Sequence, residues 1–300
     1  MKNMLERRTD LALEARELAA GEGGAIPGVT QEEGDAQGYP LTTVRIGSPA
    51  GAEALGKPEG VYHTLDLAGL ERREEAAFPR AVRAVAGLLS TLLPERGEVL
   101  VAGLGNRAIT PDALGPLCAD RVLVTRHLVE LAPEQFGSFR PVSALAPGVL
   151  GTTGIESAQL IRAAVDRLSP ALVVAVDALA ARRLERLCVT VQVSDTGIAP
   201  GSGVGNHRFA LDESSLGVPV VAIGVPTVVD GATLAADLLE ETGRDGTDPA
   251  SLSHAPGGTL LVSPRDVDRR VQELAKVVAY GLSLALQPQL SLEELEGLVE

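Results

Sequence analysis

Aromatic residues are scarce in this sequence of 300 residues. It contains no Trp, four Phe and three Tyr, although 45% of its residues are hydrophobic. The interior must therefore be filled by Ala, Val, Leu and Ile. A flat aromatic platform, on which the bases of single-stranded nucleic acid stack, is not expected.

Basic residues are fewer than acidic ones. The chain has 26 Lys and Arg against 40 Asp and Glu, which gives a formal net charge of -14 at pH 7. An electrostatic field of this sign repels phosphate backbones. We therefore expect no direct nucleic-acid partner.

Cysteines and long apolar runs are also rare. Cys118 and Cys188 each lie in an apolar stretch without a CxxC motif or a neighbouring set of ligands, so we expect buried, reduced thiols. No run reaches the ~18 apolar residues that a membrane-spanning helix needs, and the N-terminus lacks the apolar centre of a signal peptide. These features predict a cytoplasmic protein without a membrane partner.

From residue 97 onward, apolar runs alternate with amphipathic segments. Strands are expected at 97–105, 171–178, 187–195 and 218–226, with mainly helical segments at 111–131, 156–168 and 229–241. This order predicts an α/β fold of three layers, with helices on both faces of a mostly parallel, mixed sheet. We expect one such domain over residues 11–300.

The ends of the chain are less regular. Residues 23–40 are rich in Gly and acidic residues, which predicts a mobile lead-in outside the core. Short strands at 41–48 and 60–67 and a helix at 74–93 follow. Near the other end, Ser263 is expected to cap a long helix, with Pro264 at its first position. The segment 244–258 is expected to be a surface loop.

Two aspartates stand out as candidate catalytic residues. Asp112 follows the strand 97–105 by a short loop, and Asp177 ends the apolar run of the strand 171–178. Ligands gather at the carboxyl ends of parallel strands. If the two strands are neighbours, the carboxylates can share a proton, activate a water and hydrogen-bond a peptide carbonyl. Alternatively, each Asp can cap a helix.

The run SDTG (194–197) contains the Asp-Thr-Gly triplet of pepsin-like proteases. Those proteases are all-β and use two such motifs, whereas this chain alternates strands and helices and has one. We therefore interpret Asp195 as a third carboxylate or as a residue that fixes a loop.

Glycine-rich runs and histidines give weaker signals. The glycine-rich runs lack the spacing of phosphate-binding loops, so we expect them to form turns that shape a substrate cleft. The residues concerned are Gly103, Gly105, Asn106, Gly197, Gly201 and Gly203. The four His are dispersed, with no HExxH, and no Ser stands in a GxSxG context. These observations favour neither a metal site nor a Ser triad.

Longer runs carry a more specific signal. They occur in one order over most of residues 8–270: RTDLALEARE, GLGNRAITPDALGP, VLVTRHL, FRPVSALAPGVLGTTGIES, VVAVDALAARRLERL, VQVSDTGIAPGSGVGN, GVPVVAIGVPTVVD and LLVSPRDVD. With these runs, the chain resembles the germination (spore) protease family of endospore-forming bacteria.

The resemblance implies an endopeptidase that degrades small acid-soluble spore proteins during germination. It places the two essential carboxylates at Asp112 and Asp177, and it implies a zymogen that processes itself between Asp10 and Leu11. Residues 1–10 would then be a propeptide rather than an ordinary frayed terminus. It also implies a homotetramer in the forespore cytosol, without a cofactor.

The family is also distantly similar to hydrogenase-maturation peptidases. This similarity implies that the chain has the fold of those peptidases, which also bind a metal. Ala199 stands where many spore proteases have His, which argues against a metal site on this loop. The segment 242–258 is shorter than in many family members. Two alternatives stay open: a metal-dependent maturation peptidase that uses the same carboxylates, and a non-catalytic binding protein of the same fold.

Overall fold

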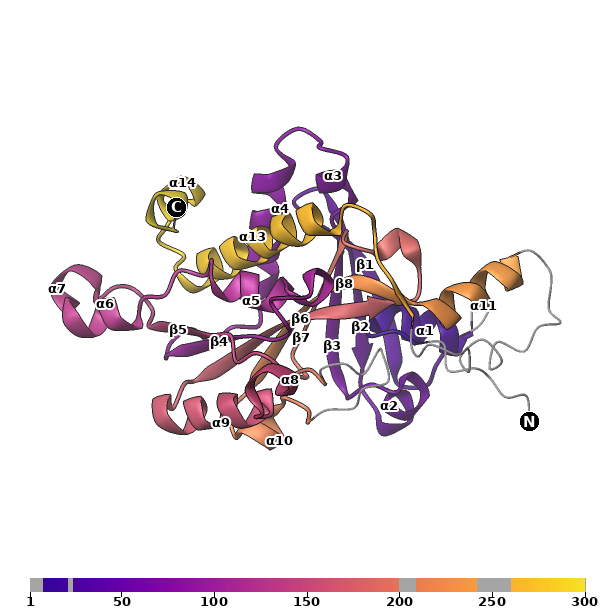
Figure 1. Cartoon of the computed structure of the whole chain (residues 1–300), viewed down its shortest axis with the longest axis horizontal. Coiled ribbons are helices and arrows are strands. Elements are labelled where there is room, and N and C mark those ends of the chain that lie inside the picture. Colours follow the sequence, from indigo (N-terminus) through magenta and orange to yellow (C-terminus); the bar gives the residue numbers. More distant parts are fainter. Residues whose placement is uncertain (1–7, 21–23, 200–208, 242–259, 300) are drawn as a thin grey trace.

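One mixed β-sheet organises the molecule (Figure 1). The computed structural model describes residues 8–20, 24–199, 209–241 and 260–299. The strand order is β1-β2-β3-β7-β8-β6-β4-β5, and β9 pairs with β8. The strands are β1 Val29–Ala36, β2 Tyr39–Ile46, β3 Gly60–Asp66, β4 Val99–Gly103, β5 Val142–Leu145, β6 Leu172–Ala181, β7 Thr190–Ser194, β8 Val220–Asp230 and β9 Leu261–Val262. The predicted α/β class with a mixed sheet is confirmed. The sheet is less parallel than expected, because three of the described strand pairings are parallel and five are antiparallel.

Helices cover both faces of this sheet. They are α1 Ala12–Ala20, α2 Pro49–Leu55, α3 Ala68–Glu71, α4 Ala77–Ser90, α5 Leu114–Ala119, α6 Arg126–Leu131, α7 Pro133–Phe136, α8 Leu150–Thr153, α9 Ser157–Leu168, α10 Glu213–Leu216, α11 Gly231–Glu241, α13 Val267–Leu286 and α14 Leu292–Val299. The described residues also contain two short 3-10 helices, η1 Thr110–Asp112 and η2 Leu184–Arg186. No helix in the described part of the chain is long and apolar enough to cross a bilayer.

The strands β5, β4, β6 and β8 form the parallel half of the sheet. Along them, side chains alternate between two apolar clusters. Val174 and Val176 pack toward α4, α5 and α13, and Val173 and Ala175 pack toward α9 and α10 (Figure 1). Because both faces are covered, these strands read as continuous apolar runs.

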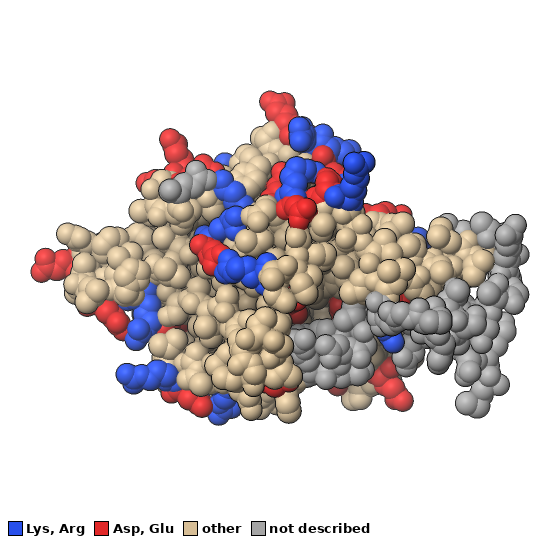
Figure 2. Space-filling view, viewed as in Figure 1, with Lys and Arg blue, Asp and Glu red and all other residues tan. Residues whose placement is uncertain are grey.

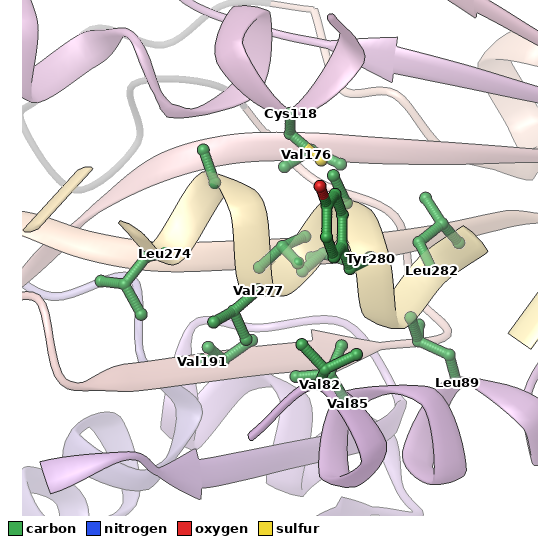
Figure 3. Packing of buried hydrophobic residues seen from close by; sticks show 14 of the residues in the cluster. Val82, Val85, Leu89, Cys118, Val176, Val191, Leu274, Val277, Tyr280 and Leu282 are labelled. Carbon is green, nitrogen blue, oxygen red and sulfur yellow. The ribbon is translucent and has the colours of Figure 1, made fainter. Parts of the chain in front are cut away.

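The cluster around α13 is built almost entirely from aliphatic side chains. Figure 3 shows Val277 and Leu274 of α13 with Val191 of β7, and Val82 and Val85 of α4 close by. This packing agrees with the low aromatic content. Cys118 and Cys188, both in the same cluster, are buried and free, as predicted. Burial raises the pKa of both thiols to about 12, which keeps them protonated.

The strands β7, β3, β2 and β1 form the antiparallel half. Residues 23–40, which were expected to be a lead-in outside the core, include β1, so that prediction is wrong for this strand. Gln37 and Gly38 both have positive φ and close a tight hairpin between β1 and β2. Leu11 and Ala12 are fully buried, and α1 packs on β2 and β3. The polar composition of β1 reflects its place at the sheet edge.

Two helix boundaries also differ from the sequence prediction. The long helix α13 begins at Val267 and not beside Ser263, because the N–H of Val267 first bonds the carbonyl of Pro264 in a turn. The segment 111–131 is divided into η1, α5 and α6. The loop expected at 244–258 lies outside the described residues.

Candidate active site

Asp177 lies inside β6 and not at its end, which corrects the sequence prediction. The apolar residues after it continue the strand and pair with β8 as far as Ala181. The shorter strand β4 ends at Gly103, which pairs with Val176, so β4 leaves the sheet beside Asp177. Asp177 is therefore at the carboxyl end of the β4–β6 ladder. Its side chain is 4% exposed, and its Oδ1 accepts the N–H of Ala178 at 2.9 Å.

The loop after β4 folds back over this position. Leu104 N–H donates to the Val176 carbonyl at 2.8 Å, and Gly105 then adopts a φ of +111°. A Cβ on Gly105 would lie 2.1 Å from the carbonyl oxygen of Asp112. Only glycine fits this close approach without strain.

Asp112 is the last residue of η1, and two contacts fix it. Its Oδ2 accepts the N–H of Asn106 at 2.7 Å. The preceding carbonyl, of Pro111, accepts the hydroxyl of Thr227 at 2.7 Å, and Thr227 lies on β8 with 1% exposure. Asp112 is thus tied both to the loop after β4 and to the sheet.

Asp112 and Asp177 line one cavity of about 350 Å³. Apolar side chains surround it, and three of them are well exposed: Ile109 at 53%, Phe209 at 72% and Leu261 at 44%. Asp10 and Glu156 also line this cavity, so four carboxylates lie along it. Its apolar rim suits a peptide with an apolar side chain near the bond that reacts.

A second cavity of about 290 Å³ adjoins the first, and Asp10 and Leu179 line both. Leu179 fits there because Gly224 on β8 has no side chain; a Cβ at Gly224 would lie 2.3 Å from Leu179 Cδ1. The two adjoining cavities, together named the groove, lie across β6, β8 and β7.

Titratable groups in the second cavity are shifted by burial. Burial lowers the pKa of Lys57, and the carboxylates of Asp10 and Glu14 oppose this effect. Lys57 is the one basic residue among the described residues that line this cavity. Burial raises the pKa of Tyr62 to about 12, and the Tyr62 hydroxyl donates to the Pro58 carbonyl at 2.9 Å.

Residues 10 and 11 lie where the two cavities meet. Asp10 N–H donates to the Ala180 carbonyl at 2.9 Å, and Asp10 Oδ2 accepts the Ala180 N–H at 2.9 Å. The side chain of Leu11 is fully buried, and it packs with Leu179 and Val229. The Asp10–Leu11 segment is thus bound along β6, next to the cavity of the two aspartates.

The other predicted cleft residues lie in different places. Gly103 is buried in β4 against the carbonyl of Gly115, and Asn106 Oδ1 accepts the Ala108 N–H at 3.0 Å. Asp195 is exposed and its Oδ1 accepts the Val61 N–H at 2.8 Å, which is the contact of a loop-fixing residue. Gly197 lines the second cavity. Gly201 and Gly203 lie outside the described residues.

No group of three or more His, Cys, Asp or Glu in the described ranges is arranged to hold a metal ion. Ala199 is exposed and lines the second cavity.

Two buried polar residues of the site were missed by the sequence analysis. Thr227 holds η1, and Gln192 on β7 bonds residues 10 and 12. Thr227 interrupts the apolar run of β8, and that interruption is the signal that could have found it. Gln192 carries a weaker signal, because Thr190 and Ser194 of the same strand are also polar.

Comparison with known proteins agrees with this picture. A family model described as "Germination protease" matches residues 6–248. The chain belongs to the germination protease family. It is 45% identical to the germination protease of Caldanaerobacter subterraneus, covering 97% of this chain and 98% of the relative. It is 38% identical to that of Bacillus subtilis, covering 95% of each.

Membership confirms the resemblance noted in the sequence, and the family is one of peptidases. Among solved structures, the chain is similar to the [NiFe] hydrogenase maturation protease HycI of Thermococcus kodakarensis. Identity is 20%, the match covers 65% of this chain and 98% of the other, and the TM-score is 0.37. A TM-score of this size does not establish a common fold, and the α/β assignment rests on the sheet itself.

Proposed function

We propose that the chain is an endopeptidase that degrades small acid-soluble spore proteins during germination and uses Asp112 and Asp177 to activate water. The observation that carries this proposal is their position in one cavity, next to the bound Asp10–Leu11 segment. Family membership supports the peptidase chemistry and the role in germination.

In this mechanism the two carboxylates share one proton. The ionised carboxylate takes a proton from the attacking water, and the protonated one gives its proton to the leaving amide nitrogen. The burial of Asp177 excludes bulk water from one side of the pair, which strengthens electrostatic interactions there.

We further propose that the chain is made as a zymogen and that it processes itself between Asp10 and Leu11, with residues 1–10 as the propeptide. Asp10 already lines the cavity of the two aspartates, so this bond is close to the groups that would hydrolyse it. The exposed charges give no reason to expect a nucleic-acid partner: on the face drawn in Figure 2, basic side chains lie among acidic ones.

The test is the mass of the intact protein during incubation. The wild-type chain should lose residues 1–10 with first-order kinetics, and Asp112→Asn and Asp177→Asn should each stay intact. Mixing a variant with processed wild-type chain would show whether cleavage also occurs between molecules. A variant that processes at the wild-type rate by itself would contradict the roles of the aspartates.

A chelator tests the metal-dependent alternative in the same assay. Processing that continues in excess EDTA supports the metal-free mechanism, and processing that stops with EDTA and returns with a divalent metal supports the alternative. The homotetramer and the location in the forespore cytosol are part of the proposal by family resemblance. Light scattering of the purified chain tests the homotetramer.

A further inference from the structure

Gln192 makes two hydrogen bonds to the segment that contains the proposed processing site. Its Nε2 donates to the carbonyl oxygen of Asp10 at 3.2 Å, and its Oε1 accepts the N–H of Ala12 at 2.7 Å. Since a backbone N–H can only donate, the contact with Ala12 fixes which end of the amide faces Asp10. The N–H of Gln192 is therefore directed at the carbonyl of the Asp10–Leu11 peptide bond.

The sheet places Gln192 level with Asp177. Asp177 pairs with Gly224, and Gly224 pairs with Gln192, so the three residues form one row across β6, β8 and β7. Alternation puts Asp177 and Gln192 on the same face, because their neighbours Val176 and Val191 both pack in the α13 cluster on the other face. Two strand spacings, about 10 Å of backbone, separate the aspartate from the amide.

Asp10 lies beside β6, hydrogen-bonded to Ala180, three residues beyond Asp177. It lines the cavity of Asp112 and Asp177 on one side and the cavity of Gln192 on the other. Gln192 is 8% exposed, so its amide has few competing water molecules. A carbonyl between a water-activating pair and a buried amide donor has the arrangement of an oxyanion site.

We propose that Gln192 is a further catalytic residue, whose Nε2–H stabilises the oxyanion that forms on the scissile carbonyl. This inference rests on the proposed function and deepens it. The oxygen of water bonds to the Asp10 carbonyl carbon while a carboxylate takes the water proton. The C=O π electrons move to the oxygen, which Gln192 holds. When the carbonyl re-forms, the C–N bond breaks and the nitrogen of Leu11 takes a proton from the carboxylic acid.

Gln287 provides a matched control for a purely structural amide. Its Oε1 accepts the Arg140 N–H at 2.9 Å and its Nε2 donates to the Arg140 carbonyl at 2.8 Å. It is fully buried and binds backbone in the same two-way manner, but it lines neither cavity of the groove. Loss of these two hydrogen bonds should lower the stability of the chain and leave the rate of self-processing unchanged.

The first measurement is the self-processing rate of the full chain. Gln192→Glu keeps the oxygen that accepts from Ala12 and loses the donor to Asp10. We expect about a 10²–10³-fold slower rate, the usual effect of removing one oxyanion donor. Gln287→Glu should process at nearly the wild-type rate. If Gln192→Glu does not fold, Gln192→Met, which is similar in size and has no N–H donor, takes its place.

A second measurement separates catalysis from simple positioning. The inhibition constants of the peptide aldehyde Arg-Thr-aspartal, which forms a tetrahedral hydrate, and of the matching peptide amide are compared. If Gln192 binds the oxyanion, its substitution should weaken the binding of the aldehyde about 10²-fold more than the binding of the amide. Equal weakening of both, or wild-type processing by the variant, would overturn the proposal.

Failure of the proposed function gives a different result. In that case Asp112→Asn and Asp177→Asn would process as fast as wild type, or the wild-type chain would not process at all. Either result would remove the aspartate mechanism and the role of Gln192 with it. If Gln192→Glu processes fast and the aspartate variants are inactive, only the proposed role of Gln192 is ruled out.

Discussion

The parallel half of the sheet is buried on both faces, whereas the antiparallel half becomes more exposed toward β1. All five residues of β4 are buried, and most residues of β1 are exposed. The two halves also differ in what they hold. The parallel half carries Asp177 and positions Asp112, and the antiparallel half carries Gln192, which binds the N-terminal segment. The covered, parallel half thus holds the candidate catalytic pair, while both halves bind the N-terminal segment, at Ala180 of β6 and at Gln192 of β7.

Substitution of an aspartate should affect activity very differently in the two halves, and this is the largest expected difference. Asp177→Asn should lower cleavage of a small acid-soluble spore protein about 10²–10⁴-fold, because it removes a general acid–base group. Asp195→Asn keeps the oxygen that accepts from Val61 and should cleave at nearly the wild-type rate. Rates from gel or mass assays, together with melting temperatures, check both variants. Equal losses of activity in Asp177→Asn and Asp195→Asn would show that the two aspartates do not differ in their importance for cleavage.

The next-largest difference between the two halves should be the effect of a substitution on stability. Ile223 of β8 is fully buried in the α13 cluster, so Ile223→Ala should destabilise the chain by about 2–5 kcal/mol. Thr30 on β1 is exposed, and Thr30→Ala should change stability by no more than about 0.5 kcal/mol. Urea unfolding measures both. A large effect at Thr30 would show that the outer hairpin is part of the cooperative core.

Glycines with positive φ occur in both halves, with different surroundings. Gly105→Ala would place Cβ against the Asp112 carbonyl and shift Asp112, so we expect at least about a tenfold loss of activity. Gly38→Ala at the β1–β2 hairpin meets only the Arg80 side chain, at 3.4 Å. It should cost about 1–3 kcal/mol of stability through backbone strain and leave the rate unchanged. An unchanged rate in Gly105→Ala would mean that the position of Asp112 does not matter.

The smallest effect should come from histidine protonation. Burial, and then Arg45, lower the pKa of His63 on β3, against the opposing effect of Asp195. The neutral ring therefore contributes stability above pH 6.5, and this contribution is lost as pH falls through the lowered pKa. His63→Gln should flatten the loss of stability below pH 6.5 in unfolding experiments.

His127→Gln is the control for this experiment, because His127 lies exposed on α6. This variant should keep the wild-type pH dependence. If stability depends on pH with the same slope in His63→Gln and in wild type, the pKa of His63 does not differ between the folded and unfolded chain.

The elements of the parallel half were largely predictable. Strands at 97–105, 171–178 and 218–226 were expected from continuous apolar runs, and β4, β6 and β8 lie there. Strand β1 was missed because an exposed edge strand does not need apolar residues, so Gln31, Glu32 and Glu33 conceal it.

The candidate site was predictable only in part. The motifs marked Asp112 and Asp177, but the sequence placed Asp177 at a strand end, because its charge interrupts an apolar run. Gln192 gave only a weak signal, since a single amide in a strand is as often structural as functional. Its contacts with Asp10 and Ala12 depend on how α1 packs across the sheet.

The sequence alone determined the class of the fold, the buried strands and the two candidate aspartates, because apolar periodicity and local motifs are written along the chain. Tertiary structure alone decided that Asp112 and Asp177 share a cavity and that Asp10 lies between them and Gln192. Those neighbours come from distant segments, and their meeting depends on the point at which β4 leaves the sheet and on the turn at Gly105.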